Sequence, residues 1–123
     1  MSKFVIREVP SGIKFDLKAA NGQTIATSEV YATKGVCLKG IQSVRKNAPI
    51  AKFADLTAED IQTVTNPKFE MYRDRSGAFR FRLKARNGEI IAVSEGYSSK
   101  AACENGIESV KKNAPEAEVV EAE

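Results

Sequence analysis

The chain of 123 residues contains no histidine. This absence removes the commonest general base, the usual activator of a nucleophilic side chain and the commonest neutral metal ligand. Acid–base, nucleophilic and metal-dependent catalysis therefore lose the residue that most often carries them. We predict a protein that is not an enzyme and that has no cofactor, no catalytic residue and no metal site.

Cysteine and long apolar runs are also scarce. The only cysteines, Cys37 and Cys103, lie far apart and form no CxxC pair, which fits a reducing compartment better than a disulfide scaffold. No apolar segment approaches the roughly 18 residues that would span a bilayer, and residues 1–12 lack the apolar core of a secretory signal. The sequence predicts a cytoplasmic protein with no membrane partner.

Charge of one sign dominates only weakly. The net charge is +3, from 19 lysines and arginines against 16 acidic residues. Four acidic residues follow Pro115, so residues 1–115 carry +7, because only 12 acidic residues oppose the basic ones there. A mildly basic body with an acidic tail is weak evidence for a polyanionic partner.

The most informative feature that is present is an internal repeat. Residues 15–51 and 81–117 share 22 identical residues in 37 aligned positions. Each unit has about 50 residues, which is marginal for burying a core alone. We therefore expect residues 1–58 and 68–123 to be two repeats that fold as one domain, joined by a linker at 59–67.

Each repeat begins with three predicted strands. Apolar and polar residues alternate through the second strand, as in residues 79–85, which is typical of a strand with one buried face. An Asn-Gly pair follows in both copies, at 21–22 and 87–88. Such a pair favours a two-residue type I′ turn, which joins the second and third strands as a hairpin.

The period then changes from 2 to 3.6. Cys103, Gly106, Ile107 and Val110 recur at helical spacing, and the first copy repeats this pattern, so the sequence predicts a helix with one apolar face. On that face a cysteine should be buried and inert. The helix should end at Lys-Asn-Ala-Pro, where the asparagine can adopt a left-handed conformation. The residues after the proline can form a fourth strand.

The sequence of the second repeat resembles that of a known family. The segment FRFRLKARNGEIIAVSEGYSSKAACENGIESVKKNA is similar to the signature of the YegP-like proteins, small bacterial proteins that carry a domain of unknown function. The first copy departs from it at Val30, where the family has the glycine seen at Gly96, and at Leu38 and Lys39. The resemblance implies repeats that exchange their C-terminal strands, and single-repeat relatives that do so by dimerising. It implies no activity, cofactor or site residue.

These observations together predict an α+β fold. The resemblance further implies that the two tandem β3-α-β repeats form one pseudo-two-fold antiparallel sheet, and we expect both helices to cover the same face. The opposite face is then left open, and it is the first place to look for a binding surface.

A basic strand lies in the second repeat. Arg80, Arg82, Lys84 and Arg86 alternate with apolar residues and should share the open face with Tyr72. Such a row can bind nucleic-acid phosphates while the ring stacks on a base.

The same row also has an ordinary structural explanation. A two-residue turn would place Arg80 opposite Glu95 and Arg86 opposite Glu89, while Arg82 and Lys84 would face Val93 and Ile91. Cross-strand ion pairs of this kind commonly stabilise a hairpin, and Asp16 and Ala20 interrupt the row in the first repeat. The sequence favours a solvated face over a nucleic-acid site.

A second polar group recurs where each helix begins. It consists of Ser28, Glu29, Tyr31 and Lys34 in the first repeat and Ser94, Glu95, Tyr97 and Lys100 in the second. A hydroxyl, a carboxylate, a phenol and an ammonium at a helix N-terminus could bind an anion. Because both copies must build the same turn, a structural role is favoured, with the tyrosine packing ahead of the helix.

The open face should also be partly apolar, since Ile25, Ile91 and Val93 are predicted to lie among its basic residues, with Val5 beside them. A half-apolar sheet face is a plausible protein-contact surface or dimer seam. We predict a non-enzymatic binding or structural module, a monomer or weak homodimer, with an unidentified protein or small-molecule partner. Weak, sequence-independent nucleic-acid binding through the basic strand is the alternative.

Overall fold

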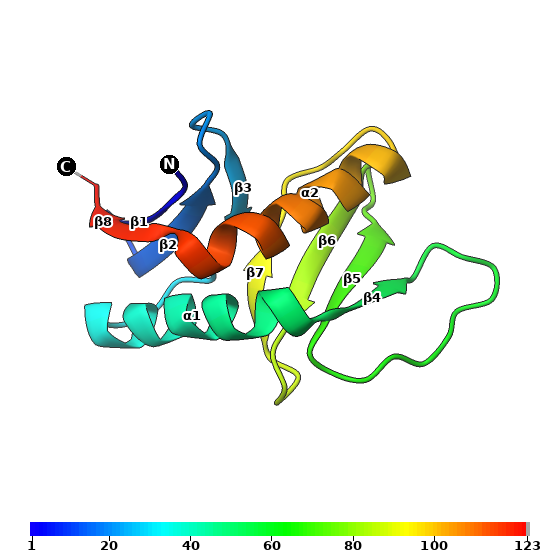
Figure 1. The fold of residues 1–123 in the computed structure, drawn as a ribbon, viewed down its shortest axis with the longest axis horizontal. Coiled ribbons are helices and arrows are strands. Elements are labelled where there is room, and N and C mark those ends of the chain that lie inside the picture. Colours follow the sequence, from blue (N-terminus) through cyan, green and yellow to red (C-terminus); the bar gives the residue numbers. More distant parts are fainter. Residues whose placement is uncertain (123) are drawn as a thin grey trace.

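The computed structural model describes residues 1–122, and Glu123, the last acidic residue of the tail, lies outside them. Within that range eight strands form one sheet and two α-helices cross one of its faces (Figure 1), which confirms the α+β class. The strands are β1 (Lys3–Val9), β2 (Gly12–Lys18), β3 (Thr24–Thr27), β4 (Lys52–Asp55), β5 (Lys68–Arg73), β6 (Phe79–Lys84), β7 (Ile90–Val93) and β8 (Glu118–Glu121). The helices are α1 (Lys34–Asn47) and α2 (Lys100–Asn113), each followed by a 3-10 turn, η1 (Ala48–Ile50) or η2 (Ala114–Glu116).

The strand order is β4-β5-β6-β7-β3-β2-β1-β8. The six inner strands pair antiparallel, but β4 pairs parallel with β5, and β8 pairs parallel with β1. The prediction of a fully antiparallel sheet is therefore wrong at both edges. Each parallel edge pair joins the last strand of one repeat to the first strand of the other, β4 to β5 and β8 to β1.

The caps of the helices follow from short polar side chains. Thr33 Oγ1 accepts a hydrogen bond from a first-turn N–H of α1 at 3.2 Å, and Ser99 Oγ does the same for α2 at 3.1 Å, as expected of N-caps. At the other end the predicted left-handed asparagine is wrong. Asn47 keeps φ near −88° and donates from Nδ2 to the carbonyl of Ser43 at 2.8 Å. Neither helix of residues 1–122 is long and apolar enough to cross a membrane.

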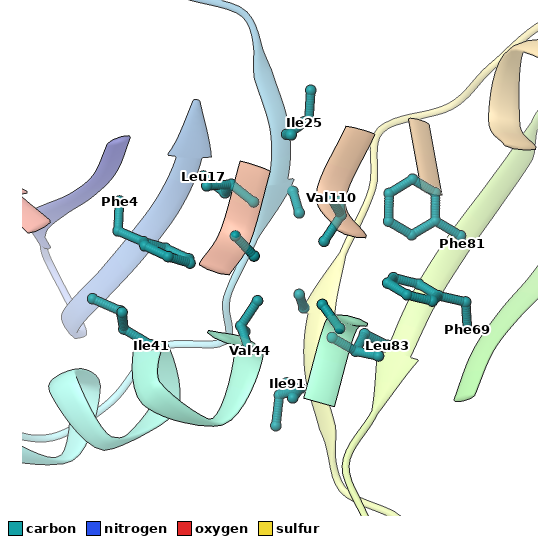
Figure 2. Packing of buried hydrophobic residues seen from close by; sticks show 14 of the residues in the cluster. Phe4, Leu17, Ile25, Ile41, Val44, Phe69, Phe81, Leu83, Ile91 and Val110 are labelled. Atoms are coloured by element: carbon teal, nitrogen blue, oxygen red, sulfur yellow. The ribbon is translucent and has the colours of Figure 1, made fainter. Parts of the chain in front are cut away.

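The core lies between the sheet and the helices and draws on both repeats. Figure 2 shows the side chains of the two repeats meeting in one cluster. Phe4 packs edge-on against Phe15 with ring centroids 5.7 Å apart, and Phe69 packs against Phe81 in the same way at 5.8 Å. Each helix also contacts a strand of the other repeat, α1 on β7 and α2 on β3. The two repeats therefore share one core.

The two Asn-Gly hairpins differ from the predicted type I′ turns. Only the glycines have positive φ, 86° at Gly22 and 84° at Gly88, and no other residue type does so within residues 1–122. In the first hairpin Gly22 N–H donates to the carbonyl of Ala19, while Ala19 N–H donates to that of Gln23. This pattern is a three-residue loop that ends in a glycine bulge.

A second irregularity, beside each turn, changes which residues face the core. Leu83 pairs with Ala92, but Lys84 pairs with Ile90, so Ile91 is the extra residue of a β-bulge. Both Ile91 and its counterpart Ile25 are buried in the core cluster. The prediction that these isoleucines lie on the open face is therefore wrong, because the bulge turns them toward the helices.

Candidate binding surfaces

A buried carboxylate organises the open face of the second repeat. Glu70 of β5 lies directly opposite Arg82 of β6 and is only 5% exposed. Arg82 Nε lies 2.7 Å from Glu70 Oε1, Lys84 Nζ lies 3.2 Å from the same oxygen, and Lys68 Nζ lies 3.4 Å from Oε2. Three cations from two strands therefore surround one carboxylate.

The charge of Glu70 is maintained by these neighbours. Burial acts to raise its pKa, but hydrogen bonds from Arg82 and Lys84 outweigh burial, so the pKa lies below its ordinary value. Hydrogen bonding to the charged form favours that form. The expectation that Arg82 and Lys84 face no carboxylate is wrong, because it considered the pairing with β7 and overlooked the other neighbour, β5.

The remaining arginine of strand β6 is also paired, although not with Glu95 as predicted. Arg80 Nε lies 2.6 Å from Asp74 Oδ2, and Arg80 Nη1 donates to the carbonyl of Ser94 at 3.2 Å. Hydrogen bonds from Ser76 and then Arg80 hold the pKa of Asp74 well below its ordinary value. Arg80 thus fixes the turn between β5 and β6 to the sheet.

The other predicted members of this surface do not complete a continuous basic row. The Arg82 guanidinium lies over the ring of Tyr72, 4.7 Å from its centroid, so it covers one face of that ring. Val93 is half-buried and pairs with Thr27 across the centre of the sheet. Arg86 lies beyond the end of β6 and is exposed in the turn, where it lines a groove against α1 rather than the open face. The predicted ion pair between Arg86 and Glu89 is absent among the described residues.

In the corresponding part of the first repeat, an acidic residue stands where the second repeat has a basic one. Asp16 occupies the position of Arg82 and is bound by Arg7 Nε at 2.7 Å and by Thr27 Oγ1 at 2.7 Å. A shallow pocket of about 200 Å³ lies beside it at the β3–β7 seam, and Lys14 and Glu95 contribute charges of both signs to its wall. The open face therefore carries a central acid–base pair in both repeats, Glu70 with Arg82 and Asp16 with Arg7.

The polar cluster at the helix starts is divided among structural contacts. Ser28 Oγ accepts a hydrogen bond from Phe15 N–H at 2.9 Å and donates to the carbonyl of Glu29 at 2.7 Å. Ser94 repeats this arrangement with the N–H of Phe81 and the carbonyl of Glu95. Both serines are buried, so their hydroxyls satisfy the backbone and are not presented to a ligand.

The tyrosines of the cluster pack onto the helices. The ring of Tyr31 stacks on Phe15 with centroids 6.3 Å apart, and Tyr97 stacks on Phe81 at the same distance. Burial, followed by the nearby cysteine, raises the pKa of each phenol above its ordinary value. The phenols therefore remain protonated at neutral pH.

The lysines of the cluster reach toward the edge strands. Lys34 Nζ lies 2.8 Å from a carboxylate oxygen of Glu121 in β8, and Lys100 Nζ lies 3.3 Å from Asp55 in β4. Each lysine therefore contacts the last strand of the other repeat. The cluster divides into serines that bind backbone, tyrosines that pack and lysines that contact the edge strands.

Both thiols lie within the core. Cys37 and Cys103 are reduced and fully buried. Burial raises the pKa of both thiols, that of Cys103 to about 11. No group of histidine, cysteine and acidic residues among residues 1–122 could hold a metal ion.

Glu70 is the main residue that the sequence reasoning missed. A signal was available, because Glu70 stands where the first repeat has Val5, directly after a phenylalanine that both copies share. A change from valine to glutamate on a strand of otherwise similar pattern indicates a new polar partner. Both sets of acid–base pairs on the open face arise at such differences between the copies.

Comparison with known proteins places the chain in a family. Residues 12–55 and 74–121 match the model of a domain of unknown function, DUF1508. The chain therefore belongs to the DUF1508 family, and the domain occurs in it twice.

Relatives with the same architecture include a YegP protein, which confirms the resemblance noted in the sequence. The solution structure of YegP from Escherichia coli, described as a protein of unknown function, matches with a TM-score of 0.80 and 35% identity over 98% of this chain and 91% of that one. A UPF0339 protein from the ptx operon 5′ region of Stutzerimonas stutzeri is 41% identical over 108 residues, 88% of this chain and 84% of the relative.

A shorter relative corresponds to about one repeat. A UPF0339 protein of Treponema denticola is 70% identical over 54 residues, which are 44% of this chain but 93% of that relative. Repeats of this kind therefore also occur singly.

Proposed function

We propose that the protein is a non-enzymatic binding module whose open sheet face contacts a protein or small-molecule partner. The observation that supports this proposal is the direction in which the protein shifts the pKa values of its acidic side chains, thiols and phenols. The pKa values of the Asp55, Glu70 and Asp74 carboxyl groups are lowered, while the pKa values of both thiols and of the Tyr31 and Tyr97 phenols are raised. The pKa of each of these groups therefore lies farther from neutral pH than its ordinary value.

General acid–base catalysis needs the opposite arrangement. A catalytic group works best when its pKa lies near the working pH, and active sites shift acids up or bases down toward that value. Here the hydrogen bonds that lower the carboxyl pKa values belong to pairs that fix the fold: Glu70 with Arg82 and Lys84 across two strands, and Asp55 with Thr57 and Asp74 with Ser76 two residues further along the chain. The same pairs hold the side chains of the open face in fixed positions, which favours recognition over chemistry.

A side-chain titration tests the proposal. Side-chain NMR between pH 5.5 and 8.5 should detect no titration of the Asp55, Glu70 and Asp74 carboxyl groups, of the two thiols or of the Tyr31 and Tyr97 phenols. A thiol reagent should label Cys37 and Cys103 only as fast as the protein unfolds. Reagent added after denaturation gives the matched full signal. One carboxyl, thiol or phenol that titrates near pH 7, or a thiol that reacts rapidly in the native protein, would instead indicate a reactive site.

Nucleic-acid binding through the basic strand remains an alternative prediction, and the pairing of Arg80, Arg82 and Lys84 with acids argues against it. If these residues bound phosphates, a single-stranded oligonucleotide would bind with an affinity that decreases with salt, and each phosphate contact removed by mutation would lower the log–log salt slope by about one. Capture of partners from cell extract with and without nuclease separates the two ideas. Partners that survive nuclease support the binding module, and partners lost with nuclease support the alternative.

We further propose that the two repeats act as one pseudo-symmetric unit that exchanges its last strands. Support comes from the pairing of β4 with β5 and of β8 with β1, because neither edge strand pairs within its own repeat. The module would then function as a monomer or as a weak homodimer. The cytoplasmic location stays a prediction.

A further inference from the structure

A second surface, on the helix side of the molecule, collects cations that form no ion pair with the acidic residues of positions 1–122. A groove of about 360 Å³ runs between α1 and the β6–β7 turn. Its polar walls are formed by Lys39, Gln42, Ser43 and Lys46 of the helix and by Arg86 and Asn87 of the turn. It is separate from the open sheet face, because Ala85, which also lines it, is a core residue on the helix side.

The cations of this groove are available to a ligand. Lys39, Lys46 and Arg86 are exposed, and within residues 1–122 no ion pair joins any of them to a carboxylate. This contrasts with Arg80 and Arg82, which are paired. One acidic residue, Glu89, lines an adjoining hollow beside Tyr31, so the combined surface keeps a net charge of +2.

The spacing of the cations favours an extended anion. Lys39 and Lys46 are seven residues apart on one helix face, which separates their backbones by about 10.5 Å. Gln42 and Ser43 lie between them on the same face, and Arg86 approaches from the opposite wall. Cations spread along the groove in this way can contact successive phosphate groups of one chain-like anion, so that no single phosphate has to accept all three of them.

The other repeat provides an internal comparison. A groove of about 480 Å³ occupies the equivalent place between α2 and the β2–β3 turn. There Asn105 replaces Lys39, Glu108 replaces Gln42 and Ala20 replaces Arg86, while Lys112 corresponds to Lys46. This twin groove is neutral. The fold alone therefore does not require the three cations.

We propose that the groove between α1 and the β6–β7 turn is a binding site for an oligophosphate, a ligand with two or more linked phosphate groups. Lysine and arginine supply charge-assisted hydrogen bonds to phosphate oxygens, and arginine can do so with two N–H groups. Among residues 1–122 no aromatic side chain lines the groove of Lys39, Lys46 and Arg86 itself, and Tyr31 lies in the adjoining hollow. The groove therefore offers no ring on which a base could stack between the cations. Recognition should therefore depend on the phosphates.

The test uses the full chain and inorganic triphosphate at about 50 mM salt, where ionic contacts are only partly screened. The disabling variant combines Lys39→Asn with Arg86→Ala, which are the residues that the chain itself carries in the twin groove. The control variant combines Lys3→Asn with Arg75→Ala, two exposed cations outside the groove, and so has the same net charge. Amide spectra establish that each variant is folded.

We expect wild-type protein to bind triphosphate with amide shifts confined to residues 39–46 and 85–89. The disabling variant should bind at least about ten-fold more weakly, since two charge-assisted contacts are lost, and the control should bind within about two-fold of wild type. Absence of binding by wild type, or equal weakening in both variants, would overturn the proposal.

A gain-of-function variant provides an independent measurement. Ala20→Arg, Asn105→Lys and Glu108→Gln together give the twin groove the same polar walls, so triphosphate should then shift a second set of amides around residues 105–112. No second set in a folded variant would contradict the proposal.

Two further probes distinguish the source of the phosphates, and the disabling variant must weaken binding of whichever probe binds. A nucleoside triphosphate that binds like inorganic triphosphate indicates a free oligophosphate recognised through its phosphates alone, a nucleoside triphosphate that binds more tightly indicates a free nucleotide, and tighter binding of a short oligothymidylate indicates a nucleic-acid backbone.

Discussion

At the scale of single residues, a glycine inside each helix provides space for a tyrosine. A Cβ atom added at Gly40 would overlap Oη and Cζ of Tyr31 and come within 3.2 Å of the Phe15 ring, and Gly106 meets Tyr97 in the same way. Alanine is the better helix former by about 1 kcal/mol, but overpacking a core costs about 1–3 kcal/mol. We expect Gly40→Ala to lower the free energy of unfolding.

The same helix contains the matched control for this prediction. Gly35 has only Thr33 Oγ1 near an added Cβ, at 3.9 Å, so Gly35→Ala should be neutral or stabilising by up to about 1 kcal/mol. Tyr31→Phe removes the overlapping oxygen and should recover part of the loss in Gly40→Ala. Urea denaturation measures all of these variants. If Gly40→Ala and Gly35→Ala prove equally stable, the tyrosine moves aside at no cost and the packing argument fails.

At the scale of elements, the Glu70 cluster joins β5 to β6. Glu70→Gln keeps the size of the side chain but removes the charge that faces Lys68, Arg82 and Lys84. Because the three cations are partly exposed and can regain water, we expect destabilisation of about 1–3 kcal/mol at pH 7. The reference is Glu89→Gln, an exposed carboxylate of the β6–β7 turn, which should change stability by less than about 0.5 kcal/mol.

The sign of the pH dependence follows from the lowered pKa of Glu70. A carboxyl whose folded pKa lies below its unfolded value contributes its stabilisation fully above the unfolded value, near 4.5, and loses it as pH falls through the folded pKa. The difference in unfolding free energy between wild type and Glu70→Gln should therefore shrink between pH 5 and pH 2. Denaturation curves at pH 7 and pH 3 measure this, and an unchanged difference would mean that the contribution is not ionic.

The elements themselves could largely be predicted from the sequence, because period and turn residues are local signals. The 14-residue helices begin after Thr33 and Ser99, at the positions that the change of period indicates. What could not be predicted was the register next to each Asn-Gly turn. A three-residue loop and a bulge both fit the same letters, and only the packing of Ile25 and Ile91 against the helices selects between them.

The candidate site was less predictable than the fold for a related reason. A cross-strand partner depends on which strand lies on each side, and a hairpin turn specifies only one of those neighbours. The pairing of β6 with β7 therefore left Arg82 and Lys84 without an acid in the sequence, while the pairing of β6 with β5 supplies Glu70. Arg86 likewise belongs to a groove whose other wall, α1, comes from the first repeat.

At the scale of the whole molecule, strand exchange makes each repeat incomplete alone. In residues 1–58, β4 would lack β5, its partner in the intact chain, and β1 would lack β8. The shared core would also be exposed, because each helix contacts a strand of the other repeat. The intact chain should accordingly unfold in a single transition, with far-UV and near-UV signals coinciding.

The final prediction concerns the separated halves. Within a homodimer of residues 1–58, β4 of one copy can pair with β1 of the other, because β4 and β8 occupy equivalent positions after the two helices. We therefore expect residues 1–58 or 66–123 alone to dimerise or to stay unfolded. Equimolar halves should also form a heterodimer with the amide spectrum of the intact chain. Sedimentation and amide dispersion measure each case, and a folded monomeric half would show that the exchanged strands are dispensable.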